Sequence, residues 1–248
     1  MKNTIVRHAV IALIATSLVA CLAGPGHAQF VLYDDFGSGV IDPVKWNSSS
    51  AEGSFNAPTT ETRRLIENGS LRLTLVSWGN TSSDSGAANS RQGVNMKQLG
   101  TLGGSGYING LGAKVTVLDA AAEDCAANST ASSQARAHLI GLFFNDGAGG
   151  AGNSTGNIFA SINMQTDNDG VNRIDAHLAR CTATDCATAA LITLPGNPVI
   201  FTTSWSPNVP LTLKLVWDQV NGKFKFTVTD PVTLATEVQK IVYLGTVT

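Results

Sequence analysis

Alternation of apolar and polar residues dominates the chain after its first 28 residues, and this period of two predicts β-strands. In the segment 211–218 leucines and a tryptophan occupy every second position, and the segment 223–229 repeats the pattern with phenylalanines and a valine. Asn221-Gly222 lies between these segments and favours a tight hairpin. The pattern predicts further strands at 30–36, 71–78, 107–118, 139–144, 158–165, 173–179 and 200–203. The alanine-rich segment 120–137 lacks such alternation and is expected to be a loop.

Length and composition favour a single sandwich domain. The chain has 248 residues, of which 43% are hydrophobic and only 14% are charged, and it contains 25 glycines. That is enough apolar material for one sizeable core, with many turns between strands. We therefore predict an all-β fold, a two-sheet antiparallel jelly-roll sandwich, in which residues 29–248 form one domain.

The first 28 residues read as an export signal. Lys2 and Arg7 precede an apolar run from Ala9 to Gly24, and small residues precede Gln29. We expect cleavage after Ala28 and a secreted or periplasmic protein; the run is short for a transmembrane span. The alternative is a lipoprotein anchored at Cys21, because the sequence Leu-Val-Ala-Cys resembles a lipobox.

The charge of the mature chain argues against nucleic acid as a partner. The full chain has a net charge of −2, and loss of the two basic residues of the signal leaves −4. No basic stripe offsets this negative charge, so we expect no nucleic-acid binding.

Three cysteines remain after the signal. Cys181 and Cys186 are separated by four residues in a turn-like segment, and export favours oxidation, so we expect a disulfide between them. Cys125 is then left over. It is either free or forms a disulfide with one of the other two cysteines in place of the Cys181–Cys186 bond. A cysteine–histidine metal site is not expected, because the mature chain has only two histidines.

Four segments resemble one family in their order and sequence. They read Y-D-D-F followed by I-D-P-x-K-W, then E-N-G-S-L-R-L-T-L, I-G-L-F-F-N-D and L-T-L-K-L-V-W-D-x-x-N-G-K-F-K-F, in 33–46, 67–75, 140–146 and 211–226. This order resembles the concanavalin A-like lectin/glucanase superfamily, and more narrowly its secreted bacterial members without an assigned function. The resemblance implies a jelly-roll sandwich over residues 30–245. It implies little about function, because that superfamily includes lectins, hydrolases, lyases and adhesion modules.

The sequence contains no catalytic signature typical of these enzymes. The glucanase-type motif E-x-D-x-x-E requires glutamates five positions apart, and no pair of the five glutamates has that spacing. The resemblance to alginate-lyase-like jelly rolls fails at Gln165, which is not followed by histidine two positions later. The segment 152–156 matches G-x-S-x-G, but a strand rather than a helix is expected to follow it. We therefore expect no catalysis, with an atypical hydrolase or lyase as an alternative.

Carbohydrate binding needs exposed aromatic faces with neighbouring amides and charged groups. The sequence places Trp78 at the polar end of a strand and Trp205 in a Ser/Pro loop, whereas Trp217 is expected in the core. The candidate sugar-binding residues are Trp78, Trp205, Arg72, Asn163, Gln165, Arg173, Asp175 and His177. The competing interpretation, which we favour for Arg173, Asp175 and His177 taken alone, is a solvated polar face of an antiparallel sheet.

Asp167 and Asp169 belong to a segment, Asp-Asn-Asp-Gly, that resembles the start of a calcium loop. The later bidentate acid is missing, so a hydrophilic turn is the favoured interpretation and Ca²⁺ the alternative. The leading functional hypothesis is a secreted lectin-like domain that binds extracellular or cell-surface glycan. A structural or adhesive surface module is the second hypothesis.

Overall fold

The computed structural model describes residues 30, 32–47, 52–57, 60–77, 92–96, 108–122, 134–143, 153–186 and 188–243. In these residues the secondary structure is all β, with no helix, and the strands pair antiparallel in three sheets. The first sheet has the order β1 (Gly53–Ala57), β2 (Thr60–Glu67), β3 (Ser70–Ser77). The second has the order β12 (Thr236–Val242), β11 (Lys223–Thr229), β10 (Leu211–Asp218), β4 (Gly110–Val115). The third has the order β5 (Gln134–Phe143), β6 (Ile158–Asp167), β7 (Asn172–Cys181), β8 (Ala189–Leu191), with β9 (Val199–Ile200) also paired to β7.

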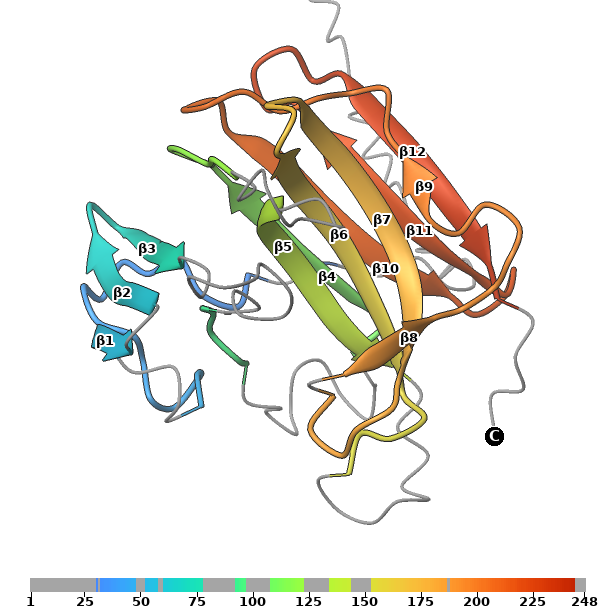
Figure 1. Cartoon of the computed structure of the whole chain (residues 1–248), viewed down its shortest axis with the longest axis horizontal. Helices are drawn as coiled ribbons and strands as arrows, with labels where there is room; N and C mark the ends of the chain where they lie inside the picture. Colours follow the sequence, from blue (N-terminus) through green and yellow to red (C-terminus); the bar gives the residue numbers. More distant parts are fainter. Residues whose placement is uncertain are drawn as a thin grey trace, which may run out of the picture.

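The second and third sheets form two layers, one in front of the other in Figure 1, and the β1–β3 sheet lies to one side of them. One apolar cluster occupies the space between the two layers. The third sheet contributes fully buried Ile162 and Leu178, and the second contributes Leu213 and Phe226. This arrangement is typical of a β-sandwich, in which the inward residues of both sheets make the core.

The predicted alternation is confirmed in β7. Ile174, Ala176 and Leu178 of β7 are 0% exposed and face the core, as the sequence predicted. Side chains at the intervening positions must then point to the outer face of the sheet, because successive residues of a strand point to opposite sides. Trp217 is also in the core, as expected, with 8% exposure.

Two expectations about elements were wrong. The strand β5 begins at Gln134, inside the segment expected to be a loop, because its alternating residues pair with the whole length of β6. The segment 30–36 forms no strand in its described residues. There Asp34 accepts hydrogen bonds from the Trp46 indole at 2.6 Å and from the Phe36 backbone amide at 2.9 Å, which favours a turn over a strand ladder.

The outer edge of β7 is completed by a side chain as well as by strands. Between the residues of β7 that pair with β8 and those that pair with β9, the Leu178 backbone amide donates a hydrogen bond to the Asn197 side-chain oxygen at 2.9 Å. The Asn197 amide group also donates to the carbonyls of Leu178 at 2.8 Å and Ile192 at 2.6 Å. The amide side chain therefore replaces one rung of the ladder and fixes the loop that carries β9 against the sheet.

The disulfide between Cys181 and Cys186 is confirmed, with a Cα–Cα distance of 4.9 Å. It closes the turn that follows β7 and leads into β8. The export signal, Cys21 and Cys125 lie outside the described residues. Within the described part of the chain, no helix is long and apolar enough to cross a membrane.

Candidate functional site

The outer face of the β5–β7 sheet carries a patch of polar side chains in cross-strand register. Asn163 of β6 lies opposite His138 on one side and Asp175 on the other. One rung away, Gln165 lies between Arg136 and Arg173, and in the other direction Ser161 lies opposite His177. Three of the predicted sugar-binding residues of β7 and two of β6 are therefore direct neighbours.

This outer face is covered, although it points away from the core. Ser161 is 0% exposed, Asn163 1% and Gln165 8%. A solvated sheet face would leave these side chains open to water, so the part of this face that β6 contributes is not simply solvated. Arg173, Asp175 and His177 of β7 are half-buried.

Two adjoining cavities lie over this face, with volumes of about 210 and 270 Å³. Both are lined by Arg136, His177 and Leu191, so we treat them together as one groove. Each cavity is smaller than a typical small-molecule site, and only the two together reach that range. The groove combines depth with polar groups.

The walls of the groove come from the segment that follows β7. Cys186, Ala189 and Leu191 line the first cavity, and Pro198 and Ile200 line the second. The disulfide holds the first wall, and Asn197 holds the loop of the second wall to β7. Walls that covalent and hydrogen bonds fix to a sheet are what a preorganised binding site needs.

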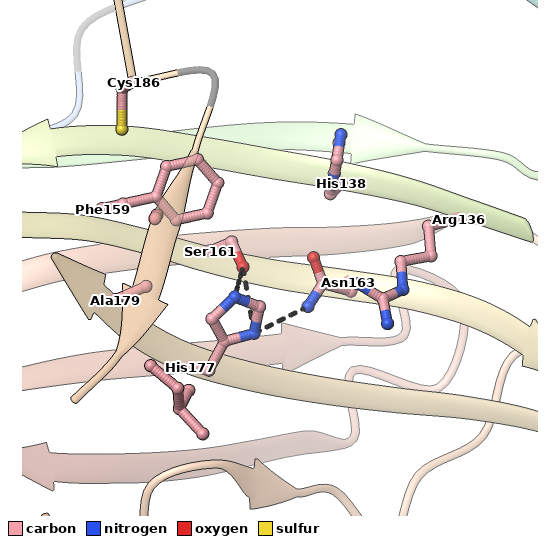
Figure 2. A pocket seen from close by; sticks show the side chains of 10 residues that line it. Arg136, His138, Phe159, Ser161, Asn163, His177, Ala179 and Cys186 are labelled. Atoms are coloured by element: carbon pink, nitrogen blue, oxygen red, sulfur yellow. Dashed lines mark hydrogen bonds between the residues drawn. The ribbon is translucent and has the colours of Figure 1, made fainter. Parts of the chain in front are cut away.

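A hydrogen-bond network joins the floor of the first cavity (Figure 2). The Asn163 amide donates to an Asp175 carboxylate oxygen at 2.6 Å and lies 3.3 Å from Nδ1 of His177. The same His177 nitrogen is 3.7 Å from the Asp175 carboxylate. Asn163 therefore orients the carboxylate and the imidazole beside it.

Ser161 and His177 do not have the geometry of a nucleophile and its base. The Ser161 hydroxyl is 3.4 Å from Nδ1 and 3.3 Å from Nε2 of the ring (Figure 2). One oxygen cannot lie on the axis of both ring nitrogens, so these contacts are poorly directed. In a Ser-His-Asp triad the acid accepts a hydrogen bond from Nδ1 of the imidazole, whereas Asp175 lies 3.7 Å from Nδ1 of His177, beyond hydrogen-bond distance.

Gln165 lines the second cavity and has an unsatisfied side-chain oxygen. Its side-chain oxygen Oε1 is buried and has no hydrogen-bond partner among the described residues. A buried amide oxygen without a partner carries a desolvation penalty of about 1–3 kcal/mol. Such groups in native proteins need an explanation, and a ligand that bonds to the oxygen is one.

Phe159 is a site residue that the sequence analysis missed. It lines the first cavity, and its ring stacks on that of His177 with centroids 6.1 Å apart and planes 20° apart. The sequence did indicate this position, since Phe159, Ser161 and Asn163 are two residues apart along β6 and so point to the same face of the sheet. Among the described residues, it is the aromatic hydrocarbon ring that lines the groove.

Trp205 is not an exposed stacking residue, and that prediction was wrong. Its side chain is 2% exposed and belongs to the core cluster. The indole N–H donates to the Gln165 backbone carbonyl at 2.9 Å, which satisfies the polar edge of the ring once it is buried. Trp205 therefore supports the strand that carries Gln165.

Two other candidates are not placed in the groove. Arg72 lies on β3, in the first sheet, where its guanidinium pairs with Glu67 at 2.6 Å. It is not a lining residue of either cavity. Trp78 lies outside the described residues, so its role stays a prediction.

Asp167 and Asp169 form a turn whose charge is matched by an arginine. Both carboxylates bind the Arg173 guanidinium, with Asp169 at 2.5 Å. The hydrogen bond from Arg173 lowers the pKa of the Asp169 carboxyl. No group of three or more potential metal ligands occurs in the part of the chain that the structure describes. Calcium binding at this turn stays an untested alternative.

Comparisons with known proteins do not assign a family to this chain: no family model, curated protein or solved structure matches it. The site must therefore be interpreted from its own chemistry.

Among the described residues, Asp175 is the carboxylate that lines the groove. Glycoside hydrolysis by the usual route needs two carboxyl groups that flank the bond. The groove instead combines amides, imidazoles, a hydroxyl, arginines and one aromatic ring. This set of groups is suited to binding a hydroxyl-rich ligand.

Proposed function

We propose that this protein is a secreted, lectin-like domain that binds extracellular or cell-surface carbohydrate in the groove, without catalysing a reaction. The observation that carries the proposal is the buried, partnerless Oε1 of Gln165 beside polar side chains that the sheet holds in register. A sugar hydroxyl both donates and accepts hydrogen bonds, so it can pair with the amide, imidazole and guanidinium groups that line the groove. We further propose that the two-layer fold is the jelly roll of the concanavalin A-like superfamily, as the sequence resemblance implies.

Phe159 supplies the second requirement of a sugar site. The C–H face of a pyranose is apolar and packs on an aromatic ring, while its hydroxyls reach neighbouring polar groups. Phe159 lies one rung from the Ser161–His177 pair, so one ring bound on Phe159 would have its hydroxyls beside that pair.

The experiment is a binding screen of the mature protein, residues 29–248, on a glycan array with and without Ca²⁺, followed by calorimetry with the glycan that binds. Phe159→Leu keeps the apolar volume but removes the ring, and it should weaken binding at least tenfold. Phe30→Leu is the matched control, because Phe30 lies over Gly110 and Gly112 of β4 in the other sheet and is 42% exposed.

Loss of binding in Phe159→Leu and retention in Phe30→Leu would support the proposal. Silence of the folded protein on the whole array would overturn it and favour the structural or adhesive module. Release of new sugar ends during incubation would instead show turnover and return the hydrolase or lyase alternative.

A further inference from the structure

Arg136 is a cation whose charge the described structure leaves uncompensated. It lies on β5, lines both cavities and has an exposed side chain. Its guanidinium donates to the neutral side-chain amide of Gln134. No carboxylate of the described residues forms an ion pair with it. Arg63 and Arg180 also form no ion pair among the described residues, but neither of them lines the groove.

The other arginine that lines the groove is different. Arg173 lies across the second cavity from Arg136, and it binds both Asp167 and Asp169. Two carboxylates therefore compensate the charge of Arg173 and hold it at the turn between β6 and β7. The cationic end of the groove is the β5 side, where Arg136 lies.

The one carboxylate that lines the groove does not cancel this charge. Asp175 lies on β7 and accepts the 2.6 Å hydrogen bond from Asn163, beside His177. A ligand anion would thus meet Arg136 on the β5 side of the groove. The polar side chains of β6 would separate the anion from Asp175 on β7.

Arg136 and Gln165 are direct cross-strand partners on the same face. Side chains in such a pair begin about 4.5–5.5 Å apart at their Cβ atoms. A ligand that binds both residues therefore carries an anionic group and a hydroxyl on one sugar ring or on adjoining rings. A guanidinium binds carboxylates and sulfate-like oxyanions through two parallel hydrogen bonds.

We propose that the groove selects acidic glycans, in which a uronate carboxylate or a sulfate ester binds Arg136 while a neighbouring hydroxyl bonds to Oε1 of Gln165. This inference rests on the proposed function and specifies its ligand class. The shared chemistry is an anionic sugar, and the carboxylate and sulfate forms are separated by the test.

The test uses calorimetry of the mature protein with two matched oligosaccharide pairs and one salt control. These are oligogalacturonate against its methyl ester, a sulfated galactan oligosaccharide against its desulfated form, and a neutral galactan oligosaccharide at low and high salt. Arg136→Gln is compared with Arg63→Gln, which makes the same charge change at an exposed arginine of β2 in the first sheet.

We expect the wild-type protein to bind one acidic probe at least tenfold more tightly than its neutral counterpart, with Arg136→Gln removing that preference and Arg63→Gln keeping it. Preference for the uronate or for the sulfate ester then identifies the anion. Equal binding of acidic and neutral probes, or equal effects of the two substitutions, would overturn the inference. If Phe159→Leu still abolished binding in that case, the proposed carbohydrate function would survive; absence of binding to every probe and to the array would overturn both.

Discussion

Replacing Gln165 with methionine is expected to stabilise the unliganded protein and to weaken ligand binding. The Oε1 atom is buried without a partner among the described residues, and the side chain is 8% exposed. Methionine has a similar length and no polar atoms, so it removes the unsatisfied oxygen without a large change of volume. Proteins commonly keep residues that serve binding at the expense of stability.

The magnitude follows from the burial of that oxygen. An unsatisfied buried acceptor costs about 1–3 kcal/mol, and imperfect packing of the new side chain offsets part of the gain. We therefore expect a net stabilisation of about 1 kcal/mol, which raises the Tm of a domain this size by about 2–4 °C. Calorimetry with the array-selected glycan should show at least a tenfold loss of affinity.

Asn163 provides the matched comparison two residues earlier on the same face. Its amide is 1% exposed but donates to Asp175, so Asn163→Leu leaves a carboxylate without its partner. That change should destabilise by about 3 kcal/mol and lower Tm by more than about 5 °C. If Gln165→Met lowered Tm as Asn163→Leu does, Oε1 would have a partner in the folded protein. The argument for an open hydrogen-bonding position would then fail.

Two further predictions concern the loops around the groove. Burial raises the pKa of Glu237, but hydrogen bonds from the backbone amides of Thr202 and Thr203 lower it overall, from 4.5 to about 2. The carboxylate therefore stabilises the fold above pH 4.5 and loses this effect as the pH falls towards 2. Glu237→Gln should cost about 1–2 kcal/mol at pH 7 and flatten the acid side of a urea-measured stability profile, whereas an unchanged profile would contradict this role. Asn197→Ala removes two hydrogen bonds that fix the second wall to β7 and a third to the Ile192 carbonyl, and it should cost about 2–3 kcal/mol and weaken glycan binding. Wild-type Tm and affinity in that variant would show that the wall is held by other contacts.

The strands of the two layers were largely predictable, because alternation is a local property. The pattern of β7 identified Ile174, Ala176 and Leu178 as one face, and these residues are in the core. Prediction failed for Gln134–Ala137, where alanines lack the β-branched or aromatic character that marks a strand. There the strand exists because β6 offers a partner along its whole length.

The candidate site was predictable only in part, for a physical reason. Alternation separates Asn163 and Gln165 from the core face, but it does not indicate whether water or another segment covers them. The walls come from residues 186–200, more than 20 positions further along the chain. A similar long-range contact buries Trp205, whose indole finds the carbonyl of Gln165 40 residues away.

The sequence by itself determined an all-β chain, the two faces of its central strands and the Cys181–Cys186 disulfide, because these depend on neighbours within a few residues. The tertiary structure decided which polar face is enclosed, which amide oxygen is left without a partner and which arginine lines the groove without a carboxylate partner. Those properties depend on pairings between distant strands and on the loops that close over them, and no local pattern encodes them.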